Sequence, residues 1–438
     1  MNEPKAAKFQ KLLYEDEMID LNQLKMIAWG GIPHKFRPLS WRLLLGYLPV
    51  AKSKRQQQLD RKRDEYERLI EQYYNDRSLD DGMWRQIHID IPRMQPLIPI
   101  FQHPRVQVSF ERILYIWSIR HPASGYVQGM NDLVTPFFLT YLSEHCDSNQ
   151  IQDVEKFDIS SVDDVSLKNI EADTYWSFSK LLDSIQNNYT HAQPGIQRLV
   201  KMLATVISRV DSDLHNHLKN NGVDYLQFAF RWMNNLLIRE LPLRLVVRLW
   251  DSYLAEGFIA TFTPPQTTVA HKPSPSSTNA QSNQNPQTIS ANNLPTSAPQ
   301  LSSLSGSSSL SSAASIIGSG GGSVYPQNLH PIGMHENQHY QHSNSRSQNS
   351  ITTVTNSGKM SSWNNGSETP FSASFHLFVC AAFLKSWSKD LLRERDFQGI
   401  MLLLQNLPTY HWSDHEIVLM LADAYHLKEI FSPSHLKI

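Results

Sequence analysis

The segment between residues 261 and 370 limits what this chain can fold into more than any other feature. Serine, asparagine, glutamine, threonine, glycine and proline fill most of it, as in SSLSGSSSLSSAAS at 302–315. Such a composition cannot bury enough apolar surface to offset the entropy lost when a chain becomes ordered. We therefore predict a disordered insertion over residues 259–370. Its charged residues are Lys272, Glu336, Arg346, Lys359 and Glu368.

The sequences on both sides of this segment are apolar and helical in pattern, and each needs a partner to cover it. The stretch 371–387 is mostly apolar, and the part of the chain that follows the segment, about 68 residues, is too small for a core of its own. Lengthening a surface loop adds little entropic cost, so a long insertion within one domain is tolerated. The predicted parts are an N-terminal helical segment at 1–30 and one discontinuous domain at 31–258 and 371–438.

The rest of the chain predicts helices. Apolar residues at 106–121 fall on one stripe at helical spacing. No glycine-rich unit of the nucleotide-binding sheet type occurs. The predicted fold class is therefore all-α, a single multi-helix domain with the insertion inside it. Further helices are predicted at 37–48, 52–74, 224–240, 241–257, 371–387, 396–407 and 415–427.

One short stretch departs from the helical pattern. In RQIHIDIPRM (85–94), Ile87, Ile89 and Ile91 alternate with polar residues as a short β-strand would. Pro92 ends that pattern and restricts the backbone on both sides of itself. The arginine that follows, Arg93, therefore stands on a stiff support.

Charge and cysteine content exclude several classes of protein. A formal net charge of −1, with 18% charged residues, argues against a general nucleic-acid binder or a polybasic membrane anchor. Two cysteines indicate no disulfide framework. The first residues lack a signal-peptide core, and the longest apolar run, at 133–142, is too short to span a bilayer. We expect a cytoplasmic protein with no transmembrane segment and no nucleic-acid partner.

Motifs of enzyme chemistry are scarce. HENQH at 335–339 has the spacing of a zinc-protease helix, but it lies within the predicted insertion, so we interpret it as a histidine-rich part of that segment. No GxxxxGK[ST] phosphate loop and no GxSxG nucleophile motif occurs. We expect no metal, no bound cofactor and no nucleotide hydrolysis by the chain alone.

Two polar residues, Arg93 and Gln128, stand in unusual settings. Gln128 belongs to SGYVQGMND at 124–132, in which Gly125 and Gly129 permit a tight bend. Taken alone, Gln128 fits a buried amide at a helix start, and Arg93 fits a partner in a surface ion pair. Presentation of both side chains to a partner is the other interpretation.

Considered together, these residues resemble the motifs of the TBC-domain family, the GTPase-activating proteins of Rab-type small GTPases. The pattern IxxDxxR stands as Ile87, Asp90 and Arg93, and YxQG stands as 126–129. Longer strings such as IRHPASGYVQGMNDLVTPFF resemble the family branch numbered twenty-two. In that branch the helix ending in the WD pair is followed closely by the counterpart of FHLFVCAAFL (375–384), which supports one interrupted domain. The other matching blocks are Gly31-Ile32-Pro33, Arg37, Trp41, DLHNHL (213–218), FAFRW (228–232), RELPL (239–243) and RLWD (248–251).

The resemblance implies a function in which this chain completes the active site of another protein. Arg93 would be an arginine finger, and Gln128 would orient the attacking water in place of the GTPase's own glutamine. GTP and Mg²⁺ would be carried by the partner, a Rab-type small GTPase. The expected supporting residues are Ile87 and Asp90 for the arginine, Tyr126 for the glutamine, and Gly129 for close approach of two backbones.

Three further expectations follow. Arg37 and Trp41 are expected to secure the first helices rather than to touch nucleotide. Met94 departs from the threonine that often follows the arginine in the family, which bears on the packing of that loop. A helical adaptor that binds a Rab or a membrane-organising partner without accelerating hydrolysis is the alternative function. By analogy with the family we expect peripheral association with the Golgi or other endomembranes.

Overall fold

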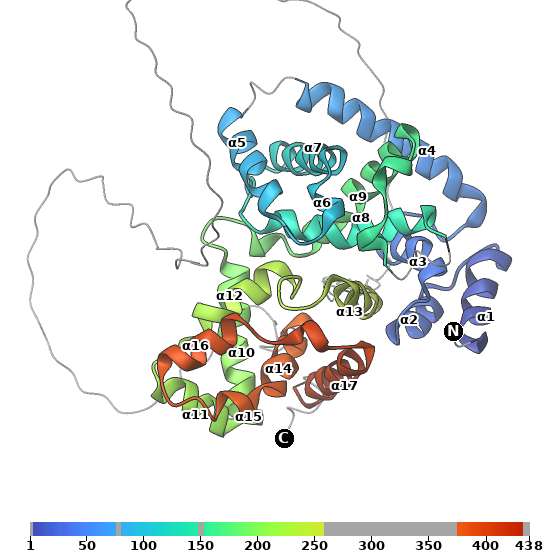
Figure 1. The fold of residues 1–438 in the computed structure, drawn as a ribbon. Helices are drawn as coiled ribbons and strands as arrows, with labels where there is room; N and C mark the ends of the chain where they lie inside the picture. The colour runs from blue at the N-terminus through green and yellow to red at the C-terminus, as the bar shows by residue number, and fades with distance from the viewer. Residues whose placement is uncertain (1–2, 76–79, 148–152, 258–374, 432–438) are drawn as a thin grey trace, which may run out of the picture. The chain divides into compact units, whose positions relative to one another are not determined.

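The structure is a computed structural model that describes residues 3–75, 80–147, 153–257 and 375–431 (Figure 1). These residues form helices joined by turns and contain no named β-strand, and Met18 and Ala51 form an isolated bridge. The predicted all-α class is confirmed. The predicted insertion at 259–370 and the HENQH sequence within it lie outside the described residues.

The helices fall before and after the gap at 258–374. Those before it are α1 (Glu3–Gln10), α2 (Leu21–Trp29), α3 (Arg37–Leu44), α4 (Arg55–Leu69), α5 (Asp81–Asp90), α6 (Pro99–Gln102), α7 (Pro104–Arg120), α8 (Thr135–Leu142), α9 (Asp164–Ser184), α10 (Pro194–Val210), α11 (Ser212–Asn220), α12 (Tyr225–Asn235) and α13 (Leu243–Glu256). Those after it are α14 (Phe375–Ser386), α15 (Ser388–Leu391), α16 (Phe397–Gln405) and α17 (Asp414–Ile430). Short 3₁₀ turns include η6 (Ile91–Arg93) and η7 (Met130–Val134).

In the first group of helices, α7 contacts α5, α6 and α9, and α9 in turn contacts α4 and α8 (Figure 1). Two buried carboxylates of α9 connect this group. Arg112 of α7 pairs with Glu171 at 2.6 Å, and Arg42 and Arg63 pair with Asp173 at 2.7 and 2.9 Å. Burial by itself would raise the pKa of Asp173, but the two guanidinium groups hold that pKa below its usual value.

Helix α13 contacts α2, α3 and α8 on one side and α14 and α17 on the other. Its buried Asp251 accepts hydrogen bonds from the backbone N–H of Ile32 at 2.8 Å, from Nε of Arg37 at 3.0 Å and from Nε1 of Trp41 at 2.8 Å. Gly31 has a φ of +94°, and a Cβ there would lie 2.6 Å from Nε of Arg248. Arg37 and Trp41 therefore secure the first helices to α13, as expected.

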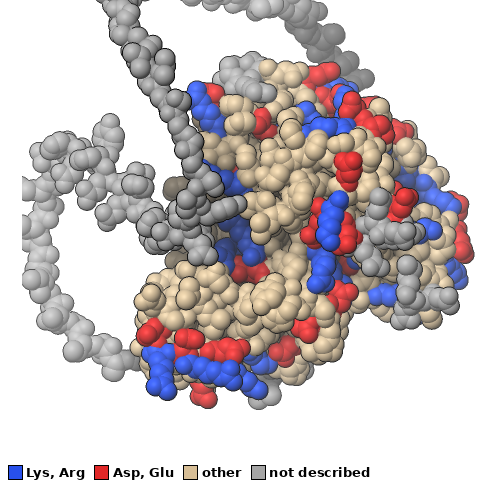
Figure 2. Space-filling view, in the orientation of Figure 1, with Lys and Arg blue, Asp and Glu red and all other residues tan. Residues whose placement is uncertain are grey.

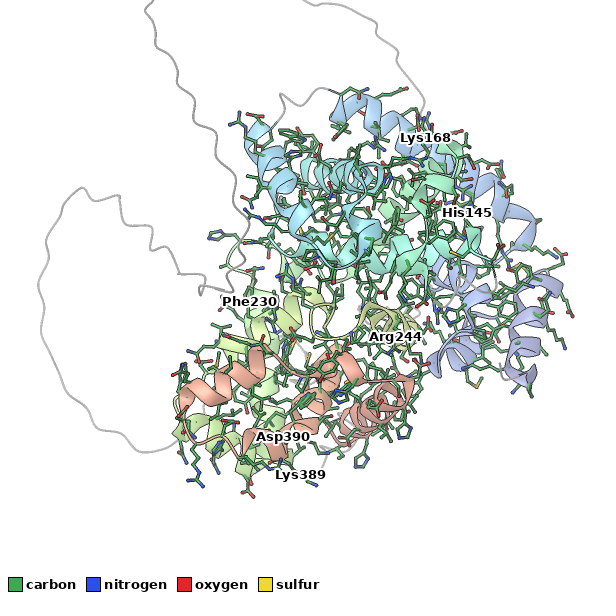
Figure 3. All side chains as sticks on the ribbon, viewed as in Figure 1. His145, Lys168, Phe230, Arg244, Lys389 and Asp390 are labelled. Carbon is green, nitrogen blue, oxygen red and sulfur yellow. The ribbon has the colours of Figure 1, made fainter. Side chains whose placement is uncertain are left out.

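Helices on the two sides of the gap at 258–374 pack together. The ring of His376 in α14 contacts the hydroxyl of Tyr253 in α13 at 2.7 Å and the carbonyl of Trp232 in α12 at 3.1 Å. Arg244, near the start of α13 (Figure 3), donates to the carbonyl of Trp412 at 2.9 Å. The described residues before and after the gap thus belong to one compact unit.

Two elements differ from their sequence-based predictions. Residues 85–94 form the end of α5 and the turn η6 instead of a strand. Ile87 and Ile91 are buried while Ile89 is 48% exposed, and the i, i+4 spacing of the two buried residues fits one face of a helix. The helix predicted at 224–240 ends at Asn235, because Leu236 and Leu237 have φ values of +50° and +64°, which end a right-handed helix.

Two general properties of the described residues bear on function. None of their helices combines the length and the apolar character needed to cross a membrane. On the face drawn in Figure 2, basic and acidic side chains are intermixed.

Candidate functional site

The arginine segment, residues 87–93, is held by the end of α5. Asp80 caps this helix by accepting a hydrogen bond from the N–H of Met83 at 2.9 Å. Ile87 is fully buried and Asp90 is 4% exposed, so the last helical turn is fixed to the core. Pro92 then continues the chain as the turn η6, which places the exposed Arg93 at its end. The side chain has no hydrogen-bond or ion-pair partner among the described residues.

The glutamine segment, residues 126–129, follows α7 and leads into η7. Gly125 has a φ of +60° and Gly129 a φ of +102°, so both bends use backbone conformations that glycine adopts without strain. Gln128 is exposed, and its side-chain amide has no hydrogen bond within the described part of the chain. Gln128 is therefore not the buried amide that fits this residue when it is considered by itself. Likewise, Arg93 is not a partner in a surface ion pair.

A hydrogen bond joins the two segments. The hydroxyl of Tyr126 donates to Oδ2 of Asp90 at 3.1 Å, and Nε2 of Gln86 donates to the same oxygen at 3.0 Å. Burial, followed by the negative Asp90, raises the pKa of Tyr126, so this hydroxyl stays protonated at neutral pH. The bond lies three residues before Arg93 and two residues before Gln128, which brings the two expected functional segments together.

Two asparagines at the end of α12 hold the glutamine segment from the other side. Nδ2 of Asn234 donates to the carbonyl of Gln128 at 3.2 Å, and Nδ2 of Asn235 donates to the carbonyl of Gly129 at 3.3 Å. A Cβ on Gly129 would lie 2.5 Å from Nδ2 of Asn234. Gly129 is thus required by this internal contact within the chain, in addition to any contact with a partner.

A buried carboxylate completes this support. Asp132 accepts hydrogen bonds from Asn235 at 2.5 Å and from Arg239 at 2.6 Å. Burial raises the pKa of Asp132 despite the opposing effect of Arg239. The sequence patterns gave no individual role to Asn234, Asn235, Asp132 or Arg239. The available signal was a pair of consecutive amides at the end of an apolar helix, which offers side-chain donors to a neighbouring backbone.

Met94, the departure from the family pattern, lies in the core. Its side chain is 2% exposed, and its carbonyl accepts a hydrogen bond from Nε2 of Gln102 at 3.1 Å. The backbone N–H of Met94 donates to the carbonyl of Ile91 at 3.0 Å, which closes the turn that carries Arg93. Methionine therefore anchors the loop here while the guanidinium of Arg93 stays exposed.

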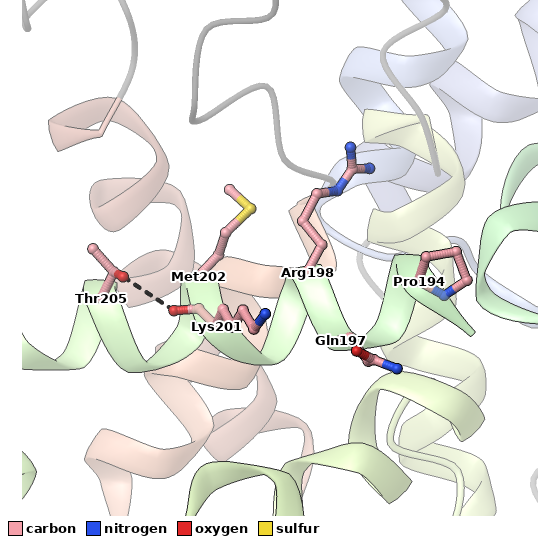
Figure 4. Close-up of a pocket in the computed structure, with 6 residues that line it drawn as sticks. All are labelled: Pro194, Gln197, Arg198, Lys201, Met202 and Thr205. Atoms are coloured by element: carbon pink, nitrogen blue, oxygen red, sulfur yellow. Dashed lines mark hydrogen bonds between the residues drawn. The ribbon is translucent and has the colours of Figure 1, made fainter. Parts of the chain in front are cut away.

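Away from these segments, neither metal-binding side chains nor a hollow on α10 gives a comparable site among the described residues. No group of histidine, cysteine and carboxylate side chains suited to a metal occurs among the described residues. A hollow on α10 is lined by Pro194, Gln197, Arg198, Lys201, Met202 and Thr205 (Figure 4). All of these come from one helix, so polar groups from different elements do not converge there.

Several known proteins are similar to this chain in sequence. The sequence profile of the Rab-GTPase-TBC domain matches residues 34–265. The chain is 42% identical over 435 residues to TBC1 domain family member 22B of Homo sapiens, a match that covers 98% of this chain and 63% of that protein. It is 40% identical over 430 residues to GTPase-activating protein GYP1 of Saccharomyces cerevisiae, covering 96% of this chain and 58% of that protein. The chain thus spans about three fifths of the length of these relatives.

Solved structures share the fold. The crystal structure of the Ypt/Rab-GAP domain of Gyp1p matches with a TM-score of 0.69 at 35% identity, covering 98% of this chain and 99% of that one. A Chlamydomonas flagellar RabGAP TBC domain matches with a TM-score of 0.51 at 14% identity, covering 97% of this chain and 90% of that one, and supports the fold alone. Because the sequence profile, the overall identity and the fold agree with the resemblance found in the motifs, the chain belongs to the Rab-GTPase-TBC domain family.

Proposed function

We propose that this protein accelerates GTP hydrolysis by a Rab-type small GTPase and inserts Arg93 and Gln128 into the partner's active site. The observation that supports this most directly is the hydrogen bond between Tyr126 and Asp90. It connects the segment of the arginine to the segment of the glutamine, and both of those side chains are exposed. This bond holds together the two segments whose side chains are proposed to act at one phosphate.

The chemistry explains the choice of an arginine. Phosphoryl transfer to water builds negative charge on the transferred phosphate and asks little covalent work of the protein. An arginine supplied in trans accelerates hydrolysis by roughly 10³–10⁵, or about 4–7 kcal/mol of barrier. Arginine stays ionised, and its planar fork can contact two oxygens at once. The Pro92 turn and buried Met94 lower the cost of ordering this side chain.

In the proposed mechanism Gln128 orients the attacking water. Its backbone is held by Asn234, and the neighbouring carbonyl of Gly129 is held by Asn235, so the exposed amide extends from a fixed main chain. GTP and Mg²⁺ come with the partner GTPase, and the chain alone is expected not to hydrolyse GTP. We further propose a cytoplasmic protein with peripheral association at the Golgi or other endomembranes.

The test is single-turnover GTP hydrolysis by a panel of Rab proteins with and without this protein. Arg93→Ala is expected to lower the acceleration by at least about 10³, and Arg93→Lys is expected to recover little of it, because lysine lacks the planar fork. The melting temperature should be nearly unchanged, since the Arg93 side chain is exposed and makes no hydrogen bond or ion pair with the described residues. An Arg93→Ala variant with full acceleration contradicts the proposal.

A binding measurement separates this function from the adaptor. Aluminium fluoride with GDP mimics the transferring phosphate, so an activating protein should bind that complex more tightly than the GDP complex. An adaptor should bind both alike. Gln128→Ala is a useful companion variant, because it should lose the preference for the aluminium fluoride complex while it keeps the folded structure.

A further inference from the structure

Leu97 lies close to Arg93 in the chain and is almost fully exposed. Its exposed fraction is 93%, the largest among the big apolar side chains of the described residues. Single exposed leucines are common on protein surfaces and need no special explanation. The surroundings of this one differ, because the backbone that carries it is fixed and a proposed catalytic side chain lies four residues earlier in the chain.

The loop that presents Leu97 is held on both sides. Gln95 has a φ of +44°, a conformation that residues other than glycine keep only where the surrounding structure enforces it. The N–H of Ile98 donates to the carbonyl of Gln95 at 2.9 Å, which closes a turn around Leu97. Met94 before the turn and Ile100 after it are 2% and 3% exposed. Leu97 is thus held outward at the top of an anchored turn.

Several exposed apolar residues lie near Leu97 and Arg93 in the chain. Pro92, Pro96 and Pro99 are exposed along with Leu97, and Arg93 lies among them in the chain. Exposed apolar residues next to a charged one match the composition of an interaction site, in which apolar contacts exclude water around the group that acts.

Leu97 is close enough to Arg93 to share one interface with it. Four residues of extended chain span at most about 14 Å. An interface of standard size covers about 800 Å² on each partner, roughly a disc of 16 Å radius. Leu97 therefore lies within reach of an interface of standard size that is centred on Arg93.

We propose that Leu97 is an apolar anchor that packs against the GTPase beside its nucleotide pocket, on the segments that the γ-phosphate orders. This inference rests on the proposed function and adds a binding residue to it. Arg93 acts on the reacting phosphate, whereas Leu97 contacts protein equally in the ground state and in the transition state. Leu97 therefore affects the Michaelis constant for the GTPase and leaves the maximal rate unchanged.

The test compares Leu97→Asp with the unchanged protein in GTP hydrolysis, with the most responsive Rab of the panel as the varied substrate. Replacing a buried leucine by a carboxylate is expected to raise KM by about 10- to 100-fold and to change kcat by less than about twofold. Leu97→Met should retain most of the affinity, since methionine keeps the apolar contact. Because Leu97 is exposed, the melting temperatures of all variants should agree.

Leu419 on α17 provides a matched control. It is 57% exposed, and α17 is far from α5 in Figure 1. Leu419→Asp introduces the same charge elsewhere and is expected to leave KM unchanged.

The outcomes separate the two proposals. An unchanged KM for Leu97→Asp, or a fall in kcat with KM unchanged, overturns the anchor while the activating function stands. If no Rab of the panel is accelerated but one is bound, the catalytic proposal fails. The dissociation constants of the Leu97→Asp and Leu419→Asp variants then still test the anchor. If no Rab is accelerated or bound, both proposals fail.

Discussion

Removing the hydroxyl of Tyr126 tests whether the junction between the arginine and glutamine segments matters for activity. In Tyr126→Phe the ring remains and the 3.1 Å hydrogen bond to Asp90 is lost. Hydrogen bonds to charged groups contribute about 1.5–3 kcal/mol to stability. Asp90 keeps its bond from Gln86, and the Tyr126 side chain is only partly buried. We therefore expect a loss at the lower end, about 1–2 kcal/mol in the free energy of unfolding.

The effect on activity should exceed the effect on folding. With the junction open, the glutamine segment loses its bond to α5 and keeps its backbone bonds to Asn234 and Asn235. A displacement of about 1 Å in a positioned group can cost roughly 10²-fold in rate. We expect kcat for GTP hydrolysis by the Rab to fall by about 10- to 100-fold. Urea unfolding and single-turnover hydrolysis measure the two quantities on the same protein.

Tyr66 offers a matched control for this experiment. Its hydroxyl donates to Glu171 at 2.9 Å, also a tyrosine–carboxylate bond, in the contact between α4 and α9. Tyr66→Phe should lose comparable or greater stability, because this tyrosine is 2% exposed, and it should keep full activity below its melting temperature. Equal rates for Tyr126→Phe and the unchanged protein, or an equal loss in both variants, would refute the reasoning.

Four further outcomes are expected. Gly129→Ala should lose about 2–4 kcal/mol in the free energy of unfolding, because Gly129 has a positive φ and a Cβ there would meet Asn234. Gly125 also has a positive φ but faces open space, so Gly125→Ala should lose about 1–2 kcal/mol, and urea titration compares the two variants. Asp251→Asn should cost about 3–5 kcal/mol, seen as a lower melting temperature, because it leaves the buried Arg37 without its carboxylate. The lowered pKa of Asp173 means that its ion pairs stabilise the fold above about pH 4, the unfolded value, and that this stabilisation is lost as pH falls through the lower folded pKa. Asp173→Asn should therefore be less stable at pH 7 but lose less stability on acidification, and equal acid sensitivity in urea titrations at the two pH values would contradict this. Deletion of 262–369 should leave a single cooperative melt, because Tyr253 and His376 join α13 to α14, and an insoluble or broadly melting product would speak against one interrupted domain.

Local sequence patterns predicted the helices well where one face is apolar and the ends carry signals. Helix α13 begins and ends close to its expected bounds, with Pro242 at one end and Gly257 at the other. The pattern at 85–94 was ambiguous, because residues four positions apart, such as Ile87 and Ile91, share a face both on a β-strand and on an α-helix. Only the burial of Ile87 and Ile91, with Ile89 exposed, distinguishes the two.

Local sequence patterns could not predict the side-chain contacts that hold the candidate site in place. Asn234 and Asn235 contact residues more than a hundred positions earlier in the chain. The same is true of Asp251, which holds Arg37 and Trp41 from more than two hundred positions away. Neither contact leaves a periodic signal in the residues around it, since each depends on how distant helices pack.

The sequence by itself determined the helical class and the stiff turn before Arg93, because these depend on residues within one or two turns of each other. It also placed Gln128 in the YxQG motif, two residues after Tyr126 and directly before Gly129. Tertiary structure alone decided that Tyr126 reaches Asp90, that two amides of α12 hold the glutamine segment, and that Leu97 stays in solvent. The physical reason is that backbone preference acts over a few residues, whereas these contacts and exposures are set by packing between helices far apart in the chain.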